Sequence, residues 1–203
     1  MDMINQSLFA VSNGLLIPTI VLLLLFAAQA LVLIGMSYGV YASRLAFIKS
    51  IKPALHDLTA DNVDEVLDVN KLRKTGLVNI YLAQLLAVRN QPVKADKVLS
   101  DFEMACEKEL GMVKMLAKVG PILGLMGTLI PLGPALTGLA SGDMQTLATN
   151  MQVAFATTVV GLVIGAIGFF LTQIKSRWYA EDLSDLDYIY ATISSASSTK
   201  SGA

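Results

Sequence analysis

The sequence predicts an all-α, polytopic membrane protein with three transmembrane helices and long helices that extend into the cytoplasm. Three observations lead to this fold class. Of 203 residues, 54% are hydrophobic and only 15% charged, against roughly 25% charged residues in soluble domains. The apolar residues gather in two blocks, residues 15–42 and 119–172, and nearly all charges lie elsewhere. No charged residue stands between Asp2 and Arg44, as expected of a membrane-spanning segment.

The first block predicts one transmembrane helix over residues 15–42, preceded by an extracytoplasmic N-terminal segment, residues 1–14. Pro18 falls in the first turn of this helix, where its missing N–H costs little. The apolar run is far longer than the roughly 7–15 residues of a signal peptide, and no Lys or Arg precedes it. We therefore expect a helix that stays in the membrane.

The second block is long enough for two further helices, over residues 119–139 and 151–172. Ala140-Ser141-Gly142-Asp143 interrupts the apolar pattern with turn residues. Each half reaches the roughly 20 residues that a crossing needs. With a connection over residues 140–150, the two helices form an antiparallel hairpin.

The distribution of Lys and Arg predicts the orientation. Residues 43–118 hold twelve of the fifteen basic residues, and the tail, residues 173–203, holds the other three. Basic residues concentrate in cytoplasmic loops of membrane proteins. We therefore expect the N-terminus and the 140–150 loop outside a plasma or inner membrane, and both basic segments in the cytoplasm.

The cytoplasmic segments read as helical. One helix is expected to start near Asp61–Glu65, a second to cover Gly76–Arg89, and a third to begin near Pro92 and run into the second span. The sequence of the tail predicts a helix over Ile174–Ile193, followed by a flexible end, Ser194–Ala203. The charged residues of the third helix are expected to form a solvated face: Asp96, Lys97, Asp101, Glu103, Glu107, Lys108 and Glu109.

Several function classes lack the residues that they need. The single cysteine, Cys106, and the single histidine, His56, support neither an intrachain disulfide nor a metal site, and no cofactor is expected. No Asp, Glu, His, Lys or Arg lies inside any of the three spans, and Asp143 belongs to the outer loop. An ion pathway normally needs an ionisable group at membrane depth, so that group would have to come from another polypeptide.

Small residues recur along the hairpin at helical spacing. The second span contains Gly120, Gly124 and Gly127, and the third contains Gly161, Gly165 and Gly168, with Ala154, Thr158 and Thr172 on the same stripe. Small side chains allow helices to approach closely in lipid. Packing of the three helices within one chain explains these glycines adequately.

Threonines and prolines add polar groups to the apolar spans. The hydroxyls belong to Thr128, Thr157 and Thr158, and each can either bond to a carbonyl of its own helix or line a narrow polar path. For Thr128 and Thr158 the two interpretations are about equally weighted. The prolines, Pro121, Pro131 and Pro134, are expected to free backbone carbonyls and to bend the second span.

Two stretches of the hairpin resemble the MotA/TolQ/ExbB proton channel family. They are Gly120-Pro-Ile-Leu-Gly-Leu-Met-Gly-Thr128 and Ala154-Phe-Ala-Thr-Thr-Val-Val-Gly-Leu162. Three spans with a large loop after the first are similar to ExbB and TolQ, whereas MotA has four. The run from Leu129 to Pro134 departs from the common Val-Trp-Gly-Ile pattern, which favours a divergent branch, with an archaeal one among the options.

The resemblance implies a homopentamer around two single-span partner helices of the ExbD/TolR kind, which supply an intramembrane Asp. It implies that Thr128 and Thr158 line the pore, and that Pro121 stands near the inner end of the second span. Thr157 stands where many members have Ala, so its share in the ion pathway is open. The resemblance also implies that H⁺ or Na⁺ flow drives motion of the ring and partner relative to each other.

Two other function classes remain to be compared with this one. A non-conducting membrane scaffold that assembles a transport complex would use the same glycine stripes. A membrane enzyme ranks last, because no nucleophile, base or metal cluster lies near the bilayer. The sequence does not distinguish H⁺ from Na⁺, since hydroxyl and carbonyl oxygens can serve either ion.

Overall fold

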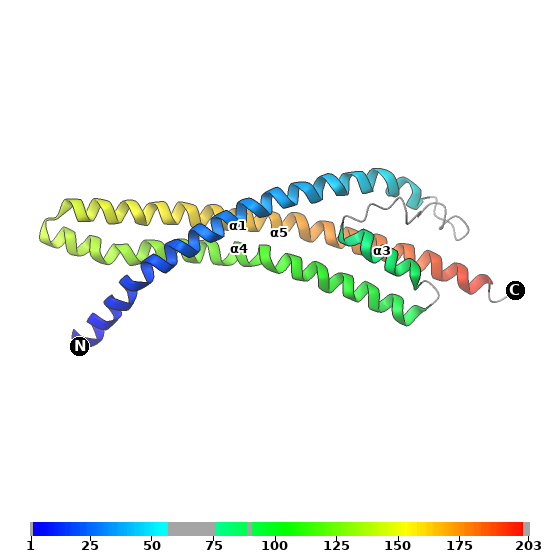
Figure 1. Cartoon of the computed structure of the whole chain (residues 1–203), viewed down its shortest axis with the longest axis horizontal. Helices are drawn as coiled ribbons and strands as arrows, with labels where there is room; N and C mark the ends of the chain where they lie inside the picture. The colour runs from blue at the N-terminus through cyan, green and yellow to red at the C-terminus, as the bar shows by residue number, and fades with distance from the viewer. Residues whose placement is uncertain (1, 57–75, 89–90, 201–203) are drawn as a thin grey trace. The chain divides into compact units, whose positions relative to one another are not determined.

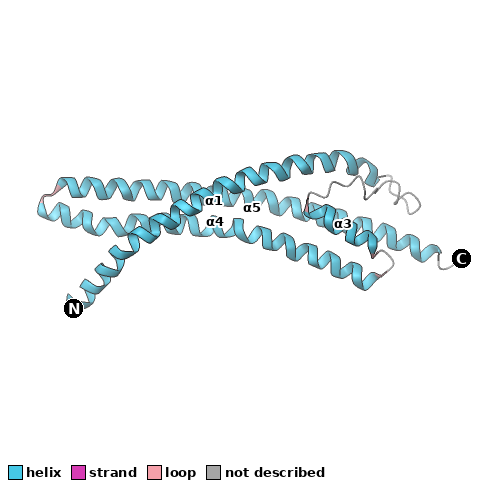
Figure 2. Cartoon of the chain, in the orientation of Figure 1, coloured by secondary structure: helices cyan, strands magenta, loops and turns pink. Residues whose placement is uncertain are grey.

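The described part of the chain is built from helices. The computed structural model describes residues 2–56, 76–88 and 91–200, and none of these lies in a strand. The helices of this described part are α1 (Asp2–His56), α3 (Leu77–Ala87), α4 (Pro92–Ser141) and α5 (Met144–Lys200), and Figures 1 and 2 show their course. The predicted all-α fold is confirmed. The helix start expected near Asp61–Glu65 lies outside the described residues.

Three of the helices are long and apolar enough to cross a membrane. The segments are Gln6–Tyr41 of α1, Pro92–Ser141, which is all of α4, and Met144–Ser194 of α5. They contain the three spans predicted from sequence. The prediction of three transmembrane helices is thus confirmed as far as length and composition go. The structure also agrees with the expectation that one helix starts near Pro92 and continues into the second span.

Helix α1 begins earlier than the sequence predicted. Residues 1–14 were expected to precede the first helix, but α1 starts at Asp2. No proline lies in this stretch, and the Ser7 hydroxyl donates to the carbonyl of Met3, 2.8 Å away. The Phe9 ring lies against α4, because a β-carbon on Gly133 would be 3.1 Å from Phe9 Cε1. The N-terminal segment is therefore part of the helix.

The turn between α4 and α5 is shorter than the predicted 140–150 connection. Only Gly142 and Asp143 lie between the helices. Gly142 has φ of 75°, which glycine adopts without steric cost. The Asp143 amide donates to Gly138 O at 2.8 Å and the Gly142 amide to Leu139 O at 3.2 Å. These two bonds form a Schellman motif, which closes the end of α4 within one turn.

The opposite end of α5 also differs from the prediction. The chain was expected to be flexible from Ser194 onward, but α5 continues to Lys200. Ile193, directly before this stretch, is buried in a hydrophobic core. Because the helix is still held by packing at that point, its last turns extend beyond the predicted end.

The three prolines of α4 lie inside one continuous helix. Pro131 is fully buried, and Pro121 packs against α5, since a β-carbon on Gly165 would lie 2.5 Å from Pro121 Cγ. A proline in a helix removes one backbone hydrogen bond, and neighbouring helices make such a loss tolerable in a membrane. The expected interruption of the hydrogen bonding therefore does not end the helix.

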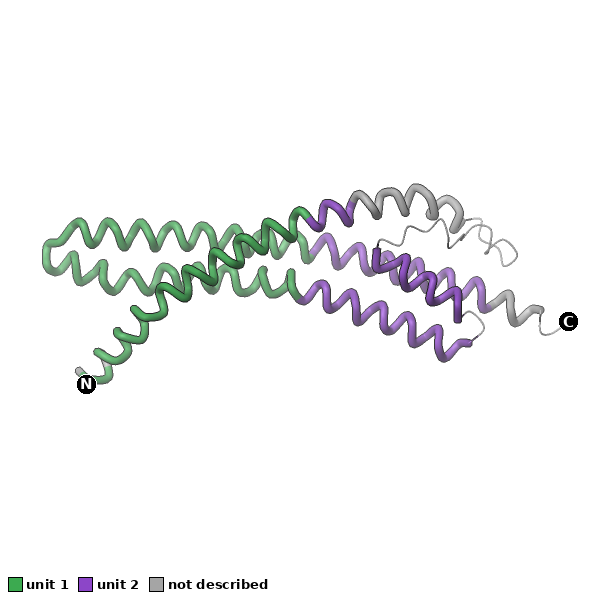
Figure 3. Tube along the Cα trace, in the orientation of Figure 1, with its two compact units in different colours: residues 1–35, 112–172 green, residues 36–111, 173–203 purple. Residues whose placement is uncertain are grey.

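The chain divides into two compact units, coloured separately in Figure 3. Unit 1 contains Met1–Gly35 and Met112–Thr172, and its core joins α1 to α4 and α5. The buried side chains of this core are Leu23, Ala30, Leu33, Leu116, Leu123 and Ile164. Many large apolar side chains of unit 1 are exposed, Leu25, Phe155 and Phe170 among them, as expected for helices that face lipid.

Unit 2 contains Met36–Gly111 and Gln173–Ala203. Its core is formed by α3, the first part of α4 and the last part of α5, with Phe102 at its centre, fully buried. The Tyr81 ring meets the Phe102 ring edge-on, with centroids 5.4 Å apart. Tyr41 of α1 stacks on Trp178 of α5 at 5.7 Å. The buried residues of the core are Leu82, Leu85, Ala95, Phe102, Cys106, Leu186, Ile189 and Ile193.

The close packing of unit 1 predicts that Gly161→Ala lowers stability by roughly 1–3 kcal/mol, the typical cost of overpacking. A β-carbon there would lie 2.6 Å from Gly124 Cα. Gly14→Ala is the matched control, because nothing lies within 4 Å of its added carbon. The measurement is the free energy of unfolding in detergent. Equal stability of the two variants would contradict the packing described.

Candidate functional site

The α4–α5 hairpin contains the residues that the sequence singled out, and its two helices are in backbone contact. One such contact joins Gly124 and Gly161. A β-carbon on Gly161 would lie 2.6 Å from Gly124 Cα and 2.7 Å from Gly120 O. Real β-carbons do not approach this closely, so glycine is required there for the two backbones to meet.

The close contact continues along the hairpin in both directions. Away from the turn, Gly165 lies against Pro121, and Gly168 lies against the backbone of Ala117. Toward the turn, a β-carbon on Gly138 would be 3.1 Å from Thr146 Cβ. We call this line of contacts the glycine seam; its members are Gly120, Gly124, Gly127, Gly138, Gly161, Gly165 and Gly168.

Thr157 packs into the glycine seam at Gly127. Its side chain fills the space that Gly127 leaves, because a β-carbon on Gly127 would lie 2.5 Å from Thr157 Oγ1. The sequence placed Thr158 on the stripe of small residues, whereas the side chain that packs against Gly127 is that of Thr157. Only 6% of Thr157 is exposed. Its hydroxyl lies 3.0 Å from the carbonyl oxygens of both Val153 and Ala154.

Thr128 and Thr158 are both partly exposed. The Thr128 hydroxyl donates to Leu125 O at 2.7 Å, and the Thr158 hydroxyl donates to Ala154 O at 3.0 Å. Each hydroxyl thus uses its proton within its own helix. Each oxygen keeps lone pairs that can accept a hydrogen bond or contact a cation.

Both threonines lie on the same edge of the hairpin. Leu123 of α4 and Ile164 of α5 pack toward α1 in the core of unit 1. At about 100° per residue, Thr128 is about 140° around α4 from Leu123, and Thr158 is about 120° around α5 from Ile164. On each helix the glycine seam lies between the residue that faces α1 and the threonine. Thr128 and Thr158 therefore share the edge away from α1, which we call the threonine edge.

The sequence of the hairpin matches one known family. The sequence model of the MotA/TolQ/ExbB proton channel family matches residues 90–187, which cover α4 and most of α5. This stretch, just under half of the chain, is similar to the MotA/TolQ/ExbB family. The resemblance inferred from the two motifs is confirmed over this range. No curated protein matches the chain.

The family is one of membrane channel proteins that oligomerise and work with partner proteins. The glycine seam and the threonine edge both lie inside the matched range. Among the described residues, no group of three or more His, Cys, Asp or Glu could hold a metal ion. What the hairpin offers chemically is hydroxyl and carbonyl oxygens in apolar surroundings.

Asp143 is the acid at the turn of the hairpin, and it caps α5. Its Oδ1 accepts from the Thr146 amide at 3.0 Å, and its Oδ2 accepts from the Thr146 hydroxyl at 2.5 Å. These bonds, the side-chain one first, hold the pKa of Asp143 below its usual value. The carboxylate is exposed at the end of the hairpin, so its role is that of a helix cap.

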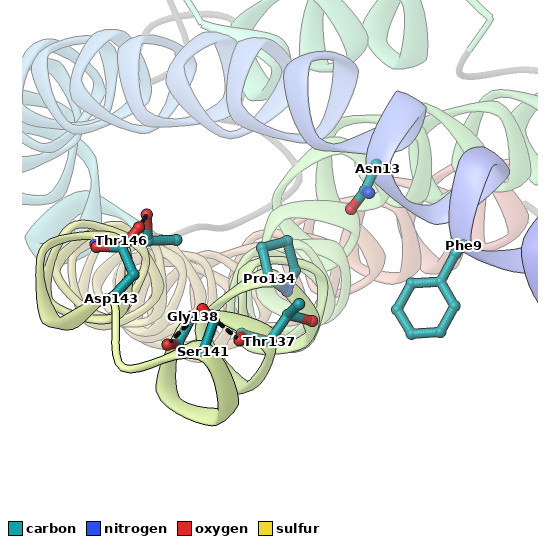
Figure 4. Close-up of a pocket in the computed structure, with 8 residues that line it drawn as sticks. All are labelled: Phe9, Asn13, Pro134, Thr137, Gly138, Ser141, Asp143 and Thr146. Carbon is teal, nitrogen blue, oxygen red and sulfur yellow. Dashed lines mark hydrogen bonds between the residues drawn. The ribbon is translucent and has the colours of Figure 1, made fainter.

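A pocket of about 400 Å³ opens beside this turn. Figure 4 shows that Phe9 and Asn13 of α1 line it from one side and the end of the hairpin from the other. The pocket is therefore on the α1 side of the hairpin, away from the threonine edge. Its remaining lining residues are Pro134, Thr137, Gly138, Ser141, Asp143 and Thr146.

Unit 2 contains a polar contact that sequence reasoning missed. Glu109 was expected on a solvated face, but the Tyr179 hydroxyl donates to its Oε2. Lys175 Nζ lies 3.8 Å from the same oxygen, and the Lys175 side chain is only 8% exposed. The sequence feature that could have indicated this contact is the spacing of Lys175 and Tyr179, which are four residues apart and so share one face of α5. Lys97 and Asp101 form an exposed i,i+4 ion pair, as suits the solvated face that the sequence predicted.

Burial, followed by the hydrogen bond to Glu109, raises the pKa of Tyr179 above its usual 10.0. Since the folded chain holds this proton more tightly than the unfolded chain, Tyr179 contributes stability that is present below pH 10 and lost above it. We expect Tyr179→Phe to cost roughly 1.5–3 kcal/mol at neutral pH and to reduce the loss of stability above pH 10.

The measurement is unfolding in detergent between pH 8 and pH 11.5. Tyr188→Phe is the control, because its ring is exposed. Burial also raises the pKa of Cys106 to about 12, so part of the alkaline loss should persist in Tyr179→Phe. An unchanged pH profile in that variant would show that Tyr179 is not held as described.

Proposed function

We propose that this chain is a ring-forming subunit of an ion-driven motor complex, which couples the flow of H⁺ or Na⁺ to mechanical work. The observation that carries the proposal is the threonine edge: two hydroxyls, inside the spans predicted from sequence, on a side of the hairpin that α1 leaves uncovered. The similarity of residues 90–187 to the MotA/TolQ/ExbB family supports it.

The proposed pathway needs a second polypeptide. Thr128 and Thr158 offer oxygens, and the predicted spans contain no carboxylate that could bind and release an ion. Ion pathways through membranes normally use an ionisable group at this depth. A single-span partner of the ExbD/TolR kind, with an intramembrane Asp opposite the threonine edge, would supply that group.

The proposed assembly follows the family resemblance. Five copies would surround two partner helices, so that the threonine edges face the centre of the ring. The excess of Lys and Arg in residues 43–118 and 173–203 favours a plasma or inner membrane protein with these segments in the cytoplasm.

Thr158→Val tests the pathway, because it keeps the shape of the side chain and removes the hydroxyl. We expect the complex to assemble and the ion flux to fall roughly tenfold to a hundredfold, corresponding to a hydrogen bond to a charged group. Thr172→Val is the matched control, since Thr172 makes the same bond to its own helix, to Gly168 O at 2.7 Å, near the end of the predicted span.

The measurement is H⁺ and Na⁺ flux in membrane vesicles that contain the chain and its partner. Normal flux of both ions in Thr158→Val would contradict the proposal. If the wild-type complex assembles but carries no ion flux, the non-conducting scaffold is favoured instead. The glycine seam alone would be enough for that role.

The proposed orientation predicts different labelling of two exposed methionine positions. Met144 lies at the turn of the hairpin and is 61% exposed, and Met104 of α4 is 54% exposed. In intact cells, a membrane-impermeant thiol reagent should label Met144→Cys and not Met104→Cys. Native Cys106 is buried and should remain unlabelled in both. The reverse pattern would mean that the chain is inserted the other way.

A further inference from the structure

The adjacent residues Thr157 and Thr158 have different surroundings. Thr157 is buried against α4, and Thr158 is partly exposed on the threonine edge. Consecutive residues of a helix point about 100° apart, so only one of the two can face α4. The rotation of α5 about its own axis decides which one does.

All three heavy atoms of the Thr157 side chain lie against α4. A β-carbon on Gly127 would lie 2.5 Å from Oγ1, 2.6 Å from Cβ and 3.1 Å from Cγ2 of Thr157. Gly124 completes the fit from the preceding turn, because its β-carbon would lie 3.2 Å from the Thr157 carbonyl oxygen. The two glycines thus form a notch in α4 that holds Thr157.

The Thr157 hydroxyl has no role left at an ion. It lies 3.0 Å from the carbonyl oxygens of both Val153 and Ala154, and the notch covers it. Its contact with α4 is therefore a matter of side-chain volume, since both of its hydrogen bonds stay within α5. A threonine and a valine have the same shape, and both prefer few rotamers in a helix.

We propose that Thr157 is a positioning residue: seated in the notch formed by Gly124 and Gly127, it sets the rotation of α5 that directs Thr158 to the ion pathway. This inference rests on the proposed function. It separates the two threonines by role, since Thr158 would contact the ion or its bound water, and Thr157 would act only through Thr158.

Four variants of the chain, in membrane vesicles with its partner, test this inference. Thr157→Val keeps the shape and should retain most of the flux per assembled complex. Thr157→Ala empties the notch and Gly127→Ala fills it, so both should lower that flux roughly tenfold, as expected when a group is displaced by about 1 Å. The double variant Gly127→Ala with Thr157→Gly exchanges the volumes and should recover flux relative to Gly127→Ala.

Flux is divided by the amount of assembled complex, because a purely structural role would change only that amount. Wild-type flux per complex in Thr157→Ala and Gly127→Ala would overturn the inference. Loss of flux in Thr157→Val equal to that in Thr158→Val would also overturn it, since Thr157 would then be an ion ligand. Normal flux in Thr158→Val would instead contradict the proposed function itself, which distinguishes the two failures.

Discussion

The contact between the backbones of Gly124 and Gly161 is the constraint on which the rest of unit 1 depends. In lipid, helices gain little from burying apolar side chains, so close packing has to hold them together. The glycine seam brings α4 and α5 near enough that any larger side chain would separate them. With the seam in place, one side of the hairpin packs on α1 and the opposite edge carries Thr128 and Thr158.

The distribution of polar groups follows from this packing. Hydroxyls in apolar surroundings need partners, and those of Thr128, Thr157 and Thr158 find them on carbonyls of their own helices. Only the first and last of these threonines remain accessible. The predicted spans offer hydroxyl and carbonyl oxygens but no acid, so the proposed motor requires a second polypeptide with a carboxylate. This requirement connects the packing of the hairpin to the proposed function.

The polar contact of unit 2 shows where reasoning from sequence stopped. The charges on the first part of α4 have the spacing of a solvated face, and the pair of Lys97 and Asp101 conforms to it. Glu109 belongs to the same pattern but meets Tyr179 and Lys175, which lie about seventy residues away in sequence. A helical period identifies which residues share a face. It does not identify which helix that face will meet.

The sequence by itself determined the fold class, the three apolar helices and the family that the hairpin resembles, because hydropathy and short motifs are local properties of the chain. It also singled out the glycines and threonines. Only the tertiary structure decided that Thr157 occupies the notch at Gly127, that α1 starts at Asp2, and that the turn contracts to Gly142 and Asp143. Those outcomes depend on the rotation and register of one helix against another, and contacts between distant segments set both.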